Sequence, residues 1–403
     1  MSADARTRVL VFNQYYWPGV EATGQLLSQL CADLSRDYSV TVITGRLAEP
    51  PAGAGRSVHE GVEVVRVRST AFPRRVLALR ALNYLTFLAA SARAAVTAPK
   101  PEVVLCMTDP PVVAIVALLA ARRARAALVV ISQDVFPEIA VLLHRIENGL
   151  VVRVLRAAIR AYLKRADRVV AIGETMGHRL EAKGAAAERL RVIPNWVDTT
   201  FLKEKPRKND WSWEVGLADR FVVMHSGNVG FAQDLDTVVR SATFLRDLDD
   251  LAIAVVGDGA RRTELMELAN LLEVDHVRFL GYQPRDALPY SLSSAHVHVV
   301  GLAPGLAGYV VPSRLYGVLA VGRPVIATAD AESETAELVS SIGCGVVVPP
   351  ARPELLAAAI RRAHDGDYDL EEMGRRARAY AVAEADRRVA VDRYRELLAE
   401  LVQ

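Results

Sequence analysis

Short apolar runs rich in β-branched residues alternate along the whole chain with longer segments whose apolar positions recur at helical spacing. This alternation is typical of parallel sheets covered by helices on both faces. In the first half we predict helices at 24–35 and 150–165, among others, and strands at 8–13, 39–44, 62–66, 103–107, 128–132 and 168–172.

The periodicity breaks after Pro194, in a stretch rich in charge, proline and tryptophan that suits a connection between domains. The final segment, 377–402, is predicted as one long, charged amphipathic helix. Between them the alternation starts afresh, with strands predicted at 221–225, 252–256, 277–280, 297–301, 324–327 and 345–348.

We therefore predict an α/β protein with two Rossmann-like, doubly wound domains facing a cleft. The first domain spans residues 1–195, a linker spans 196–218, the second domain spans 219–376, and a helix at 377–403 packs back on the first domain. A chain of 403 residues exceeds what one core usually supports. Ligands of open parallel sheets bind beyond the carboxyl ends of the strands, so the loops that follow strands should carry the chemistry.

Composition narrows the class of function. The chain is 51% hydrophobic and 24% charged with a net charge of +2, as in an ordered globular protein without a bias toward nucleic acid. Cys31, Cys106 and Cys344 are too far apart for a disulfide framework or a zinc site. No signal peptide is recognisable, and the longest apolar run, 112–121, is about half of what crosses a bilayer. We expect a cytoplasmic protein.

A glycine-rich loop follows the strand at 221–225. It contains Ser226, Gly227, Asn228 and Gly230, and Gln233 then opens a helical pattern. Glycine lets backbone N–H groups approach a diphosphate, and a following helix adds its positive end. The loop is a candidate phosphate cradle, although a turn that needs glycine explains the same residues. It has no Walker lysine, since GxxxxGK[ST] is absent from the chain.

A second loop, after the strand at 252–256, contains Gly257 and Gly259 followed by Arg261 and Arg262. It lacks the third glycine of a dinucleotide fingerprint, which argues against a dehydrogenase. Arg261 or Arg262 is either a phosphate ligand or an exposed arginine at a helix start.

The most informative cation lies in the stretch from Gly308 to Val339. Pro312 and Ser313 open a predicted helix with Ser313 as its N-cap, which puts Arg314 in the first turn. A guanidinium at this place can bind a diphosphate that also faces the helix N-terminus.

Seven segments, spread over nearly the whole chain, carry a resemblance to a known family. They read VFNQYYWPGVEATGQ, QDVFPE, IPNWVD, HSGNVGFAQDLD, VVGDG, PSRLYGVLAVGRPVIA and, ending at Glu334, ESE. In this combination they resemble the retaining nucleotide-sugar transferases of GT-B fold, in the large group that includes bacterial capsule and exopolysaccharide enzymes. The resemblance implies an acceptor domain first and a nucleotide-sugar domain second.

The chain departs from the family pattern at several positions. Many members carry two glutamates eight positions apart that touch the donor sugar and ribose, and here those positions hold Tyr309 and Gly317. A subgroup acting on lipid-linked saccharides looks similar in having a PSK segment instead, which reads PSR at 312–314. Many members also have a lysine where this chain has Gln233, which leaves Arg314 as the main cation for the diphosphate.

The resemblance implies a UDP-sugar as the expected donor. Glu334 is either the carboxylate for the ribose hydroxyls or a surface glutamate at a helix start. We expect no metal ion or other cofactor, because Arg314 and helix ends can neutralise the developing charge and no convincing Asp-x-Asp motif is present. The full predicted donor set is Ser226, Gly227, Asn228, Gln233, Gly257, Arg261, Tyr282, Pro312, Ser313, Arg314, Leu315 and Glu334.

Asp134 is the leading catalytic candidate, with Glu138 as a weaker companion. Both lie in the QDVFPE loop, which in the family faces the acceptor and the anomeric carbon. A carboxylate there can orient or partly deprotonate the acceptor hydroxyl, or stabilise an oxocarbenium-like centre. Alternatively, Asp134 only caps the next turn. The resemblance also implies retention, with the leaving diphosphate able to take the acceptor's proton.

The loop after the first strand is the candidate acceptor site. Gly19, Thr23 and Gly24 lead into a helix start that can hold a phosphate or a sugar, and Tyr16 or Trp17 can stack on a sugar ring. One aromatic residue of this loop is expected in the core instead.

Two basic amphipathic segments suggest contact with a membrane surface. They would suit docking on anionic lipid at the inner face of the plasma membrane, near a polyprenyl-linked substrate, or they are merely solvated faces. One segment, 72–95, holds Arg74, Arg75, Arg80 and Arg93, and the other presents Arg153, Arg156, Arg160 and Lys164 on one helical stripe.

Together these patterns predict a glycosyltransferase. It would move a hexose-type sugar from a nucleotide-sugar to a lipid-linked or polysaccharide acceptor with retention of configuration. A tailoring enzyme acting on a soluble natural product would need almost the same motifs. A non-catalytic nucleotide-binding partner protein is the other alternative, favoured by the missing glutamate pair.

Overall fold

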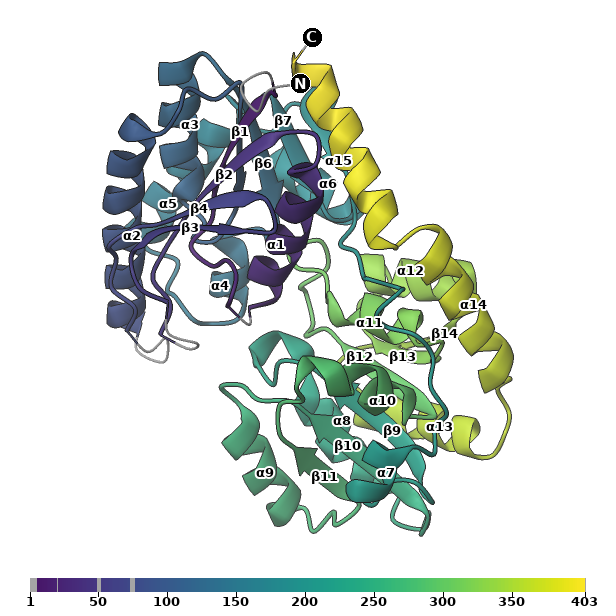
Figure 1. Cartoon of the computed structure of the whole chain (residues 1–403). Helices are drawn as coiled ribbons and strands as arrows, with labels where there is room; N and C mark the ends of the chain where they lie inside the picture. Colours follow the sequence, from purple (N-terminus) through teal and green to yellow (C-terminus); the bar gives the residue numbers. More distant parts are fainter. Residues whose placement is uncertain (1–5, 20, 49–51, 73–76, 403) are drawn as a thin grey trace. The chain divides into compact units, whose positions relative to one another are not determined.

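The computed structural model describes residues 6–19, 21–48, 52–72 and 77–402 (Figure 1). By its internal contacts the chain divides into two units, one formed by Met1–Pro194 and Ala390–Gln403 and the other by Asn195–Val389. The chain therefore passes from one unit to the other twice. Residues 196–218, predicted as a linker, fall in the second unit and include helix α7 (Asp210–Glu214).

The first unit contains a sheet whose described strands run in the order β3-β4-β2-β1-β5-β6-β7-β8. All neighbours pair in parallel except β3 and β4. The six predicted strands are confirmed to within one residue. The bounds are β1 (Arg8–Phe12), β2 (Ser39–Thr44), β3 (Gly55–His59), β4 (Val62–Arg66), β5 (Val103–Met107), β6 (Ala127–Ser132), β7 (Arg168–Ala171) and β8 (Leu190–Val192).

Helices cover both faces of this sheet. Figure 1 shows α2, α3 and α5 along one face and α1, α6 and α15 along the other. Contacts of α2 with β2, α3 with β5 and α6 with β7 join the layers. The bounds are α1 (Ala22–Leu34), α2 (Leu77–Thr97), α3 (Val113–Ala124), α4 (Glu138–Leu142), α5 (Leu150–Leu163) and α6 (Glu174–Ala182).

The second unit contains an all-parallel sheet whose described strands run in the order β11-β10-β9-β12-β13-β14. All six were predicted to within one residue. The bounds are β9 (Phe221–Ser226), β10 (Leu251–Val256), β11 (Val277–Leu280), β12 (Val297–Gly301), β13 (Val325–Thr328) and β14 (Gly345–Val348).

Alternate strand residues of the second unit enter cores on opposite faces, as the two-residue period of a strand requires. Val223 packs with α8 (Leu235–Ser241), α9 (Arg262–Leu271) and α13 (Pro353–His364). Its neighbours Val222 and Met224 face Trp211 of α7 instead. The second face is completed by α10 (Leu288–Ser293), α11 (Arg314–Ala320), α12 (Glu334–Ile342) and α14 (Leu370–Ala383).

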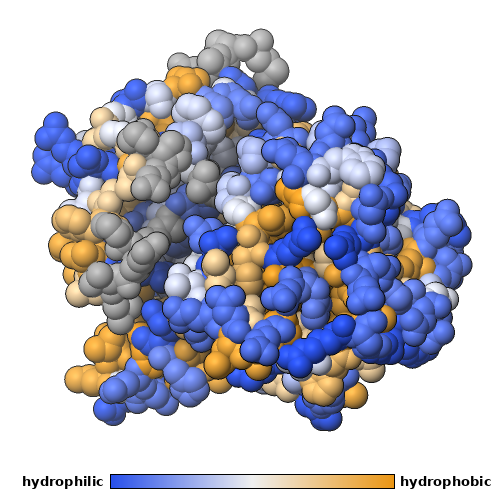
Figure 2. Space-filling model, turned by 90° about the horizontal axis from the view of Figure 1, so that it is seen from below, coloured by the Kyte–Doolittle hydropathy of each residue, from blue (hydrophilic) through white to orange (hydrophobic). Residues whose placement is uncertain are grey.

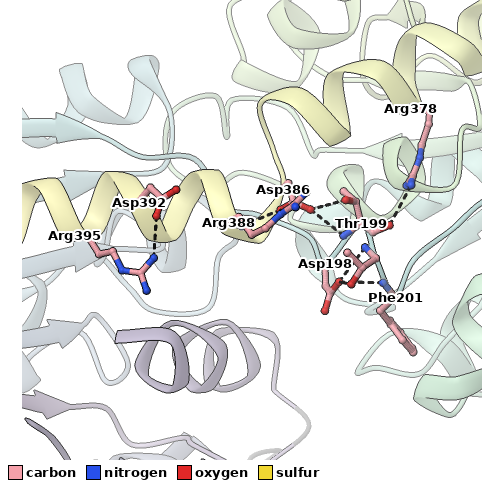
Figure 3. Close-up of polar contacts among 9 residues, drawn as sticks. Asp198, Thr199, Phe201, Arg378, Asp386, Arg388, Asp392 and Arg395 are labelled. Atoms are coloured by element: carbon pink, nitrogen blue, oxygen red, sulfur yellow. Dashed lines mark hydrogen bonds and ion pairs between the residues drawn. The ribbon is translucent and has the colours of Figure 1, made fainter. Parts of the chain in front are cut away.

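The single long helix predicted at 377–402 is wrong: the structure has two helices, α14 and α15 (Arg387–Val402). Between them lies the buried side chain of Asp386 (Figure 3). Its carboxylate accepts hydrogen bonds from Arg388 N at 3.0 Å, as an N-cap of α15, and from both the N–H and the hydroxyl of Thr199. The helix breaks at Asp386 because its carboxylate binds Thr199, a residue far away in the sequence.

The segment by which the chain enters the second unit is hydrogen-bonded to the segment by which it leaves. Val197 N donates to Ala385 O, and Arg387 N donates to Val197 O, each at 2.9 Å. Arg378 adds a hydrogen bond to Thr199 O at 3.1 Å. Beyond this point α15 contributes buried Val391, Tyr394, Leu397 and Leu398 to the protein interior.

Candidate functional site

The loops after β9 and β10 touch through their backbones. Gly227 and Gly257 both have a φ of +140°, and a Cβ on Gly257 would lie 1.9 Å from the carbonyl oxygen of Gly227. Gly227 N donates to Val256 O and Val229 N donates to Asp258 O, each at 2.9 Å. Since no side chain can occupy the space between them, the two glycines expose bare backbone beyond the strands, as a phosphate cradle requires.

Arg314, the first residue of α11, lies against the end of β9. Its Nη1 is 3.1 Å from both ring nitrogens of His225, and its Nη2 is 3.5 Å from Gly301 O. His225 Nε2 lies 3.3 Å from Asn228 O, so this nitrogen donates and Nδ1 is left to accept from Arg314. A Cβ built on Gly227 would approach the Arg314 side chain to 3.8 Å. The predicted cation and the predicted glycine loop are therefore neighbours.

The charge on Arg314 is not neutralised. Burial and the adjacent guanidinium lower the pKa of His225 well below its usual value, so the imidazole is neutral. Burial lowers the pKa of Arg314 to about 10, which still leaves it charged at neutral pH. In the described part of the chain no carboxylate forms an ion pair with Arg314. A partly buried cation that meets only neutral groups is suited to an anionic ligand.

Arg261 contrasts with Arg314. Its guanidinium binds Asp236, with one contact at 2.9 Å, and Glu264 at 3.0 Å. These carboxylates raise the pKa of Arg261 further above its usual value. Its role on a phosphate stays a prediction, and it would have to leave both partners to play it.

Gln233, which stands where many members of the resembled family have a lysine, turns back on its own loop. It ends the short helix η3 (Phe231–Gln233), and its Oε1 accepts a hydrogen bond from Gly230 N at 3.0 Å. Ser226 and Asn228 of the same loop reach solvent. The Gln233 side chain thus holds the loop in shape.

The residues around the start of α11 differ in the groups that they can present to a donor nucleotide. Ser313 is the N-cap residue of α11, as predicted, but it has right-handed helical geometry and makes no side-chain capping bond. Its hydroxyl has no recorded partner among the described residues and is free to bind a ligand. Pro312 and Leu315 are buried, and Leu315 packs in the core, so only its backbone can reach a donor.

Glu334 and Tyr282 remain predictions. Glu334 is partly buried and begins α12, a helix that Ser333 caps by accepting from Ala336 N at 3.2 Å. Tyr282 follows β11 with 60% of its surface exposed. An exposed aromatic ring can stack on a nucleotide base.

Both positions that depart from the family's glutamate pair, Tyr309 and Gly317, are partly exposed. A Cβ at Gly317 would lie 3.7 Å from Cδ1 of both Leu202 and Leu292, which is an ordinary van der Waals contact. Space for a Cβ therefore does not explain the missing glutamate at Gly317.

In the first unit, Asp134 belongs to a cluster at the carboxyl ends of β5 and β6. Thr108 Oγ1 donates to Asp134 Oδ1 at 3.5 Å, and Thr23 Oγ1 donates to Asp109 Oδ2 at 3.3 Å. Burial and the like charge of Asp109 raise the pKa of Asp134 to about 7, although Arg80, Thr108 and Lys183 act in the opposite direction. A carboxylate that titrates near neutrality is suited to proton transfer.

Glu138 is held in ion pairs. Lys183 Nζ binds its carboxylate and also donates to Phe136 O at 2.8 Å, and Arg156 Nε binds it at 3.0 Å. Burial opposes its ionisation, but Lys183 and Arg156 outweigh burial and hold the pKa of Glu138 below its usual value. This geometry fastens the loop that carries Asp134, which suits a positioning role.

The candidate acceptor loop separates its two aromatic residues. Tyr16 is fully buried and cannot stack on a sugar, whereas Trp17 is 43% exposed and stacks on His59 at 3.9 Å. Gly24 packs closely, because a Cβ there would come within 3.2 Å of the Tyr15 backbone. Gly19 closes the turn by donating to the carbonyl of residue 16 at 2.9 Å. Trp17 is thus the aromatic residue left for acceptor contact.

Comparison with known families decides the classification. Residues 21–196 match the glycosyl transferase 4-like domain, and residues 207–380 match the glycosyl transferases group 1 family. The two matches follow one another and together cover most of the chain. The chain belongs to the group 1 glycosyltransferases.

Two similar proteins come from bacteria. The putative colanic acid biosynthesis glycosyl transferase WcaI of Escherichia coli K12 is 32% identical over 221 residues, which span 54% of each protein. The match thus spans about half the length of that relative. The probable glycosyltransferase WbjE of Pseudomonas aeruginosa is 25% identical over 91% of both chains.

Solved structures share the fold of this group 1 chain. HepE of Anabaena, solved with UDP, superposes with a TM-score of 0.75 at 18% identity, covering 98% of this chain and all of that one. WaaG, described as a glycosyltransferase involved in lipopolysaccharide biosynthesis, gives a TM-score of 0.71 at 16% identity over 95% and 98% of the two chains. The predicted fold class of two parallel-sheet α/β domains is confirmed as GT-B.

Sequence reasoning missed two residues of this group 1 site. His225 stands out as a polar residue at the end of the apolar strand β9, and that contrast was its available signal. Asp109 follows the apolar strand β5 as Asp134 follows β6, so the same reasoning would have found it.

The predicted membrane-binding segments are partly engaged within the protein. Arg74 and Arg75 lie outside the described residues, and Arg156 binds Glu138 and Asn148. Around α5 and α2, however, large apolar side chains are exposed, and Figure 2 shows hydrophobic residues at the surface among hydrophilic ones. Within the described chain, no helix combines the length and apolar character needed to cross a bilayer.

The described residues contain no group of three or more His, Cys, Asp or Glu side chains arranged to hold a metal ion. The expected metal independence stays a prediction.

Proposed function

We propose that this protein transfers a hexose-type sugar from UDP to a lipid-linked or polysaccharide acceptor with retention of the anomeric configuration. The observation that carries the proposal is the contact of Arg314 with a neutral His225, beside the bare glycine backbone of Gly227 and Gly257. It leaves one uncompensated positive charge where a donor diphosphate needs it.

The nucleotide assignment draws on the shared fold and on this charge. HepE was solved with UDP and with UDP-glucose. In our proposal, the UDP diphosphate lies against the loops after β9 and β10, with Arg314 and the Ser313 hydroxyl as side-chain donors. Tyr282 stacks on the base, and Glu334 accepts from the ribose hydroxyls.

In the proposed reaction, the acceptor hydroxyl oxygen forms a bond to the anomeric carbon while the bond from that carbon to the diphosphate oxygen breaks. The electron pair of the broken bond stays on the diphosphate, whose growing charge Arg314 stabilises. The hydroxyl proton passes to the leaving diphosphate on the same face of the sugar, so the configuration is retained.

Asp134 is the proposed catalytic residue of the acceptor side. In the ground state its ionised carboxylate accepts a hydrogen bond from the acceptor hydroxyl and orients it, and the proton turns to the diphosphate as the bond to the anomeric carbon forms. Glu138, fixed by Lys183 and Arg156, acts through the loop as a positioning residue.

The proposed acceptor class is supported by the names of similar proteins, which mention colanic acid biosynthesis and lipopolysaccharide biosynthesis. We propose a membrane-bound lipid carrier, reached by peripheral docking from the cytoplasmic side. The exposed Leu150, Val151 and Val154 at the start of α5, with Arg153 and Arg160 on the same helix, form a surface that can enter an anionic bilayer interface.

Titration calorimetry with UDP, GDP and dTDP tests the donor site. UDP should bind most tightly, and Arg314→Ala should weaken it by about 10-fold to 100-fold, the loss of a charged hydrogen bond. Arg240→Ala removes an exposed arginine of the same unit and serves as control. Equal affinity of Arg314→Ala and the wild type for UDP would remove Arg314 from the donor site.

Product analysis separates the proposed reaction from its alternatives. Proton NMR of the product should show the anomeric configuration of the donor. Transfer to a prenyl-diphosphate-linked sugar, with none to soluble glycosides, supports the acceptor class. Transfer to soluble acceptors alone would indicate a tailoring enzyme, and UDP binding without turnover of any donor would indicate a non-catalytic partner.

A further inference from the structure

An open cavity of about 380 Å³ lies in the first unit, and its lining includes no residue of the loop that carries Asp134. It opens beyond the carboxyl ends of β2 and β4, which are parallel neighbours paired as far as Thr44 and Arg66. Arg46 and Arg68 each follow one of these strands by two residues. The lining consists of Arg46, Gly53, Ala54, Arg68, Ser69, Thr70 and Thr86.

The described lining of the cavity contains two guanidinium groups and no carboxylate. Neither Arg46 nor Arg68 has an ion pair or a side-chain hydrogen bond to any described residue. Next to them, buried Arg66 donates to Gly45 O at 2.7 Å and to Trp17 O at 2.6 Å, both neutral carbonyls. Arg46 and Arg68 are exposed, and among the described residues that line the cavity no carboxylate offsets their charge.

Of the hydroxyl groups that line the cavity, one has a proton available to donate to a ligand. Thr86 Oγ1 is 2.9 Å from Leu82 O, to which it donates, and so it accepts from the Thr70 N–H at 3.1 Å and the Thr70 hydroxyl at 2.9 Å. Buried Ser69 Oγ accepts from Arg46 N at 3.1 Å, and its proton has no recorded acceptor among the described residues. Two guanidiniums and one hydroxyl donor form a set that binds an oxyanion.

Apolar side chains are exposed beside the cavity. Thr86 lies on α2, and the same helix exposes Leu82, one turn before Thr86, and at 64% Leu85, the residue directly before it. Phe72 is also exposed, and its backbone is tied to Asn83 by two hydrogen bonds of 3.0 Å. An oxyanion site next to a fixed apolar surface fits an amphiphile with a charged head.

We propose that this cavity binds the phosphate groups of the lipid-linked acceptor, with the apolar chain of the lipid lying along Phe72, Leu82 and Leu85. The inference rests on the proposed acceptor class and adds the residues that recognise it. Arg46 and Arg68 contact the phosphate oxygens, and Ser69 donates its hydroxyl proton. They bind the part of the acceptor that does not react, which brings its sugar to a defined place.

Binding of farnesyl diphosphate, a short prenyl diphosphate, tests the proposal in the full-length protein. The wild type should bind it at least 10-fold more tightly than inorganic diphosphate. Arg46→Ala combined with Arg68→Ala should weaken binding about 10-fold or more, as expected for lost charged hydrogen bonds. The control is Arg122→Ala with Arg123→Ala, which removes the same charge from the last turn of α3. All variants should keep wild-type UDP affinity.

The lipid surface has its own variant. Leu82→Ser with Leu85→Ser should abolish the preference for farnesyl diphosphate over inorganic diphosphate and leave the affinity for the latter unchanged. Equal wild-type affinity for the two diphosphates would overturn the amphiphile assignment. Unchanged farnesyl diphosphate binding in the double arginine variant would overturn the cavity itself.

The donor readout separates this inference from the proposed function. Suppose that the wild type binds UDP and transfers sugar, and that the arginine variants keep full activity on a lipid-linked acceptor. This result would overturn the cavity assignment and leave the proposed function intact. The cavity assignment would also be overturned if the wild type did not bind farnesyl diphosphate and the double arginine variant lost binding to phosphatidylglycerol vesicles. The site would then recognise bilayer headgroups.

Discussion

Asp134 is the residue whose environment sets a pH dependence. Burial and Asp109 raise its pKa to about 7, and the proposed role requires the ionised form. We expect kcat/KM to fall as the pH drops below about 7, because the fraction of ionised carboxylate falls. Asp134→Asn should lower turnover about 100-fold or more and remove this inflection while sparing UDP affinity.

The control for this pH profile is Glu138→Gln. The pKa of Glu138 is lowered by Lys183 and Arg156, so its titration lies below the range of the profile. The variant should reduce turnover while keeping the inflection near pH 7. A wild-type inflection near pH 4 would mean that Asp134 titrates as an ordinary carboxylate and is not buried in the active protein.

Single residues also show how far the sequence reached. Arg314 could be predicted because a short local sequence is enough to show an arginine at the start of a helix. Its partner His225 lies 89 residues away, and no local pattern records that pairing. Tyr16 and Trp17 are adjacent aromatic residues with opposite burial, which depends on the packing of α1 and β3 around them.

At the scale of elements, the loops after β9 and β10 depend on backbone contact. Gly257→Ala places a methyl group 1.9 Å from the carbonyl of Gly227, at a φ that other residues rarely adopt. We expect a loss of stability above about 2 kcal/mol and of most UDP affinity, since the cradle must shift.

Gly281→Ala is the matched control for the glycine experiment. A Cβ at Gly281 meets nothing within 4 Å, and this glycine does not have a positive φ. Urea denaturation and UDP titration should therefore give near wild-type values. If Gly257→Ala also behaved like the wild type, the direct packing of the two loops would be disproved.

The elements themselves were predictable where local pattern decides them. The central strands are apolar runs bounded by turns, so their positions were accurate. Strand β3, GRSVH, is polar and mostly exposed, and it exists only through its antiparallel pairing with β4. The break between α14 and α15 likewise depends on Thr199, which is 187 residues from Asp386.

Asp386 should therefore matter far more than a typical helix-end aspartate. Asp386→Ala removes an N-cap and leaves the buried Thr199 N–H and hydroxyl without their acceptor. We expect a loss of about 2 kcal/mol or more in the free energy of unfolding, measured by urea denaturation. Asp392→Ala, which removes an exposed pair with Arg395, should change stability by less than about 1 kcal/mol.

At the scale of the whole molecule, the periodicity and the length of the chain were enough to predict two α/β domains. They did not indicate which unit each connecting segment belongs to. Residues 196–218 read as a linker because they lack periodicity, yet Trp211 is buried against the sheet of the second unit. Poor periodicity marks an irregular backbone and does not by itself mark a missing core.

The last residues of the chain complete the unit formed by the first ones, which leads to a prediction for the whole protein. Ending the chain after Val389 keeps Asp386 and its contacts but removes Val391, Tyr394, Leu397 and Leu398, all buried. Such side chains contribute about 1.5–3 kcal/mol each, a sum comparable with the about 5–15 kcal/mol that stabilises a domain. Calorimetry should show the first unit unfolded and the transition of the second unit kept, with UDP binding intact.

Glu400→Ala is the control for the truncation, because it removes only exposed ion pairs with Arg168 and Arg191. It should leave both transitions within a few degrees of the wild type. Two unchanged transitions after truncation would mean that α15 does not belong to the core of the first unit.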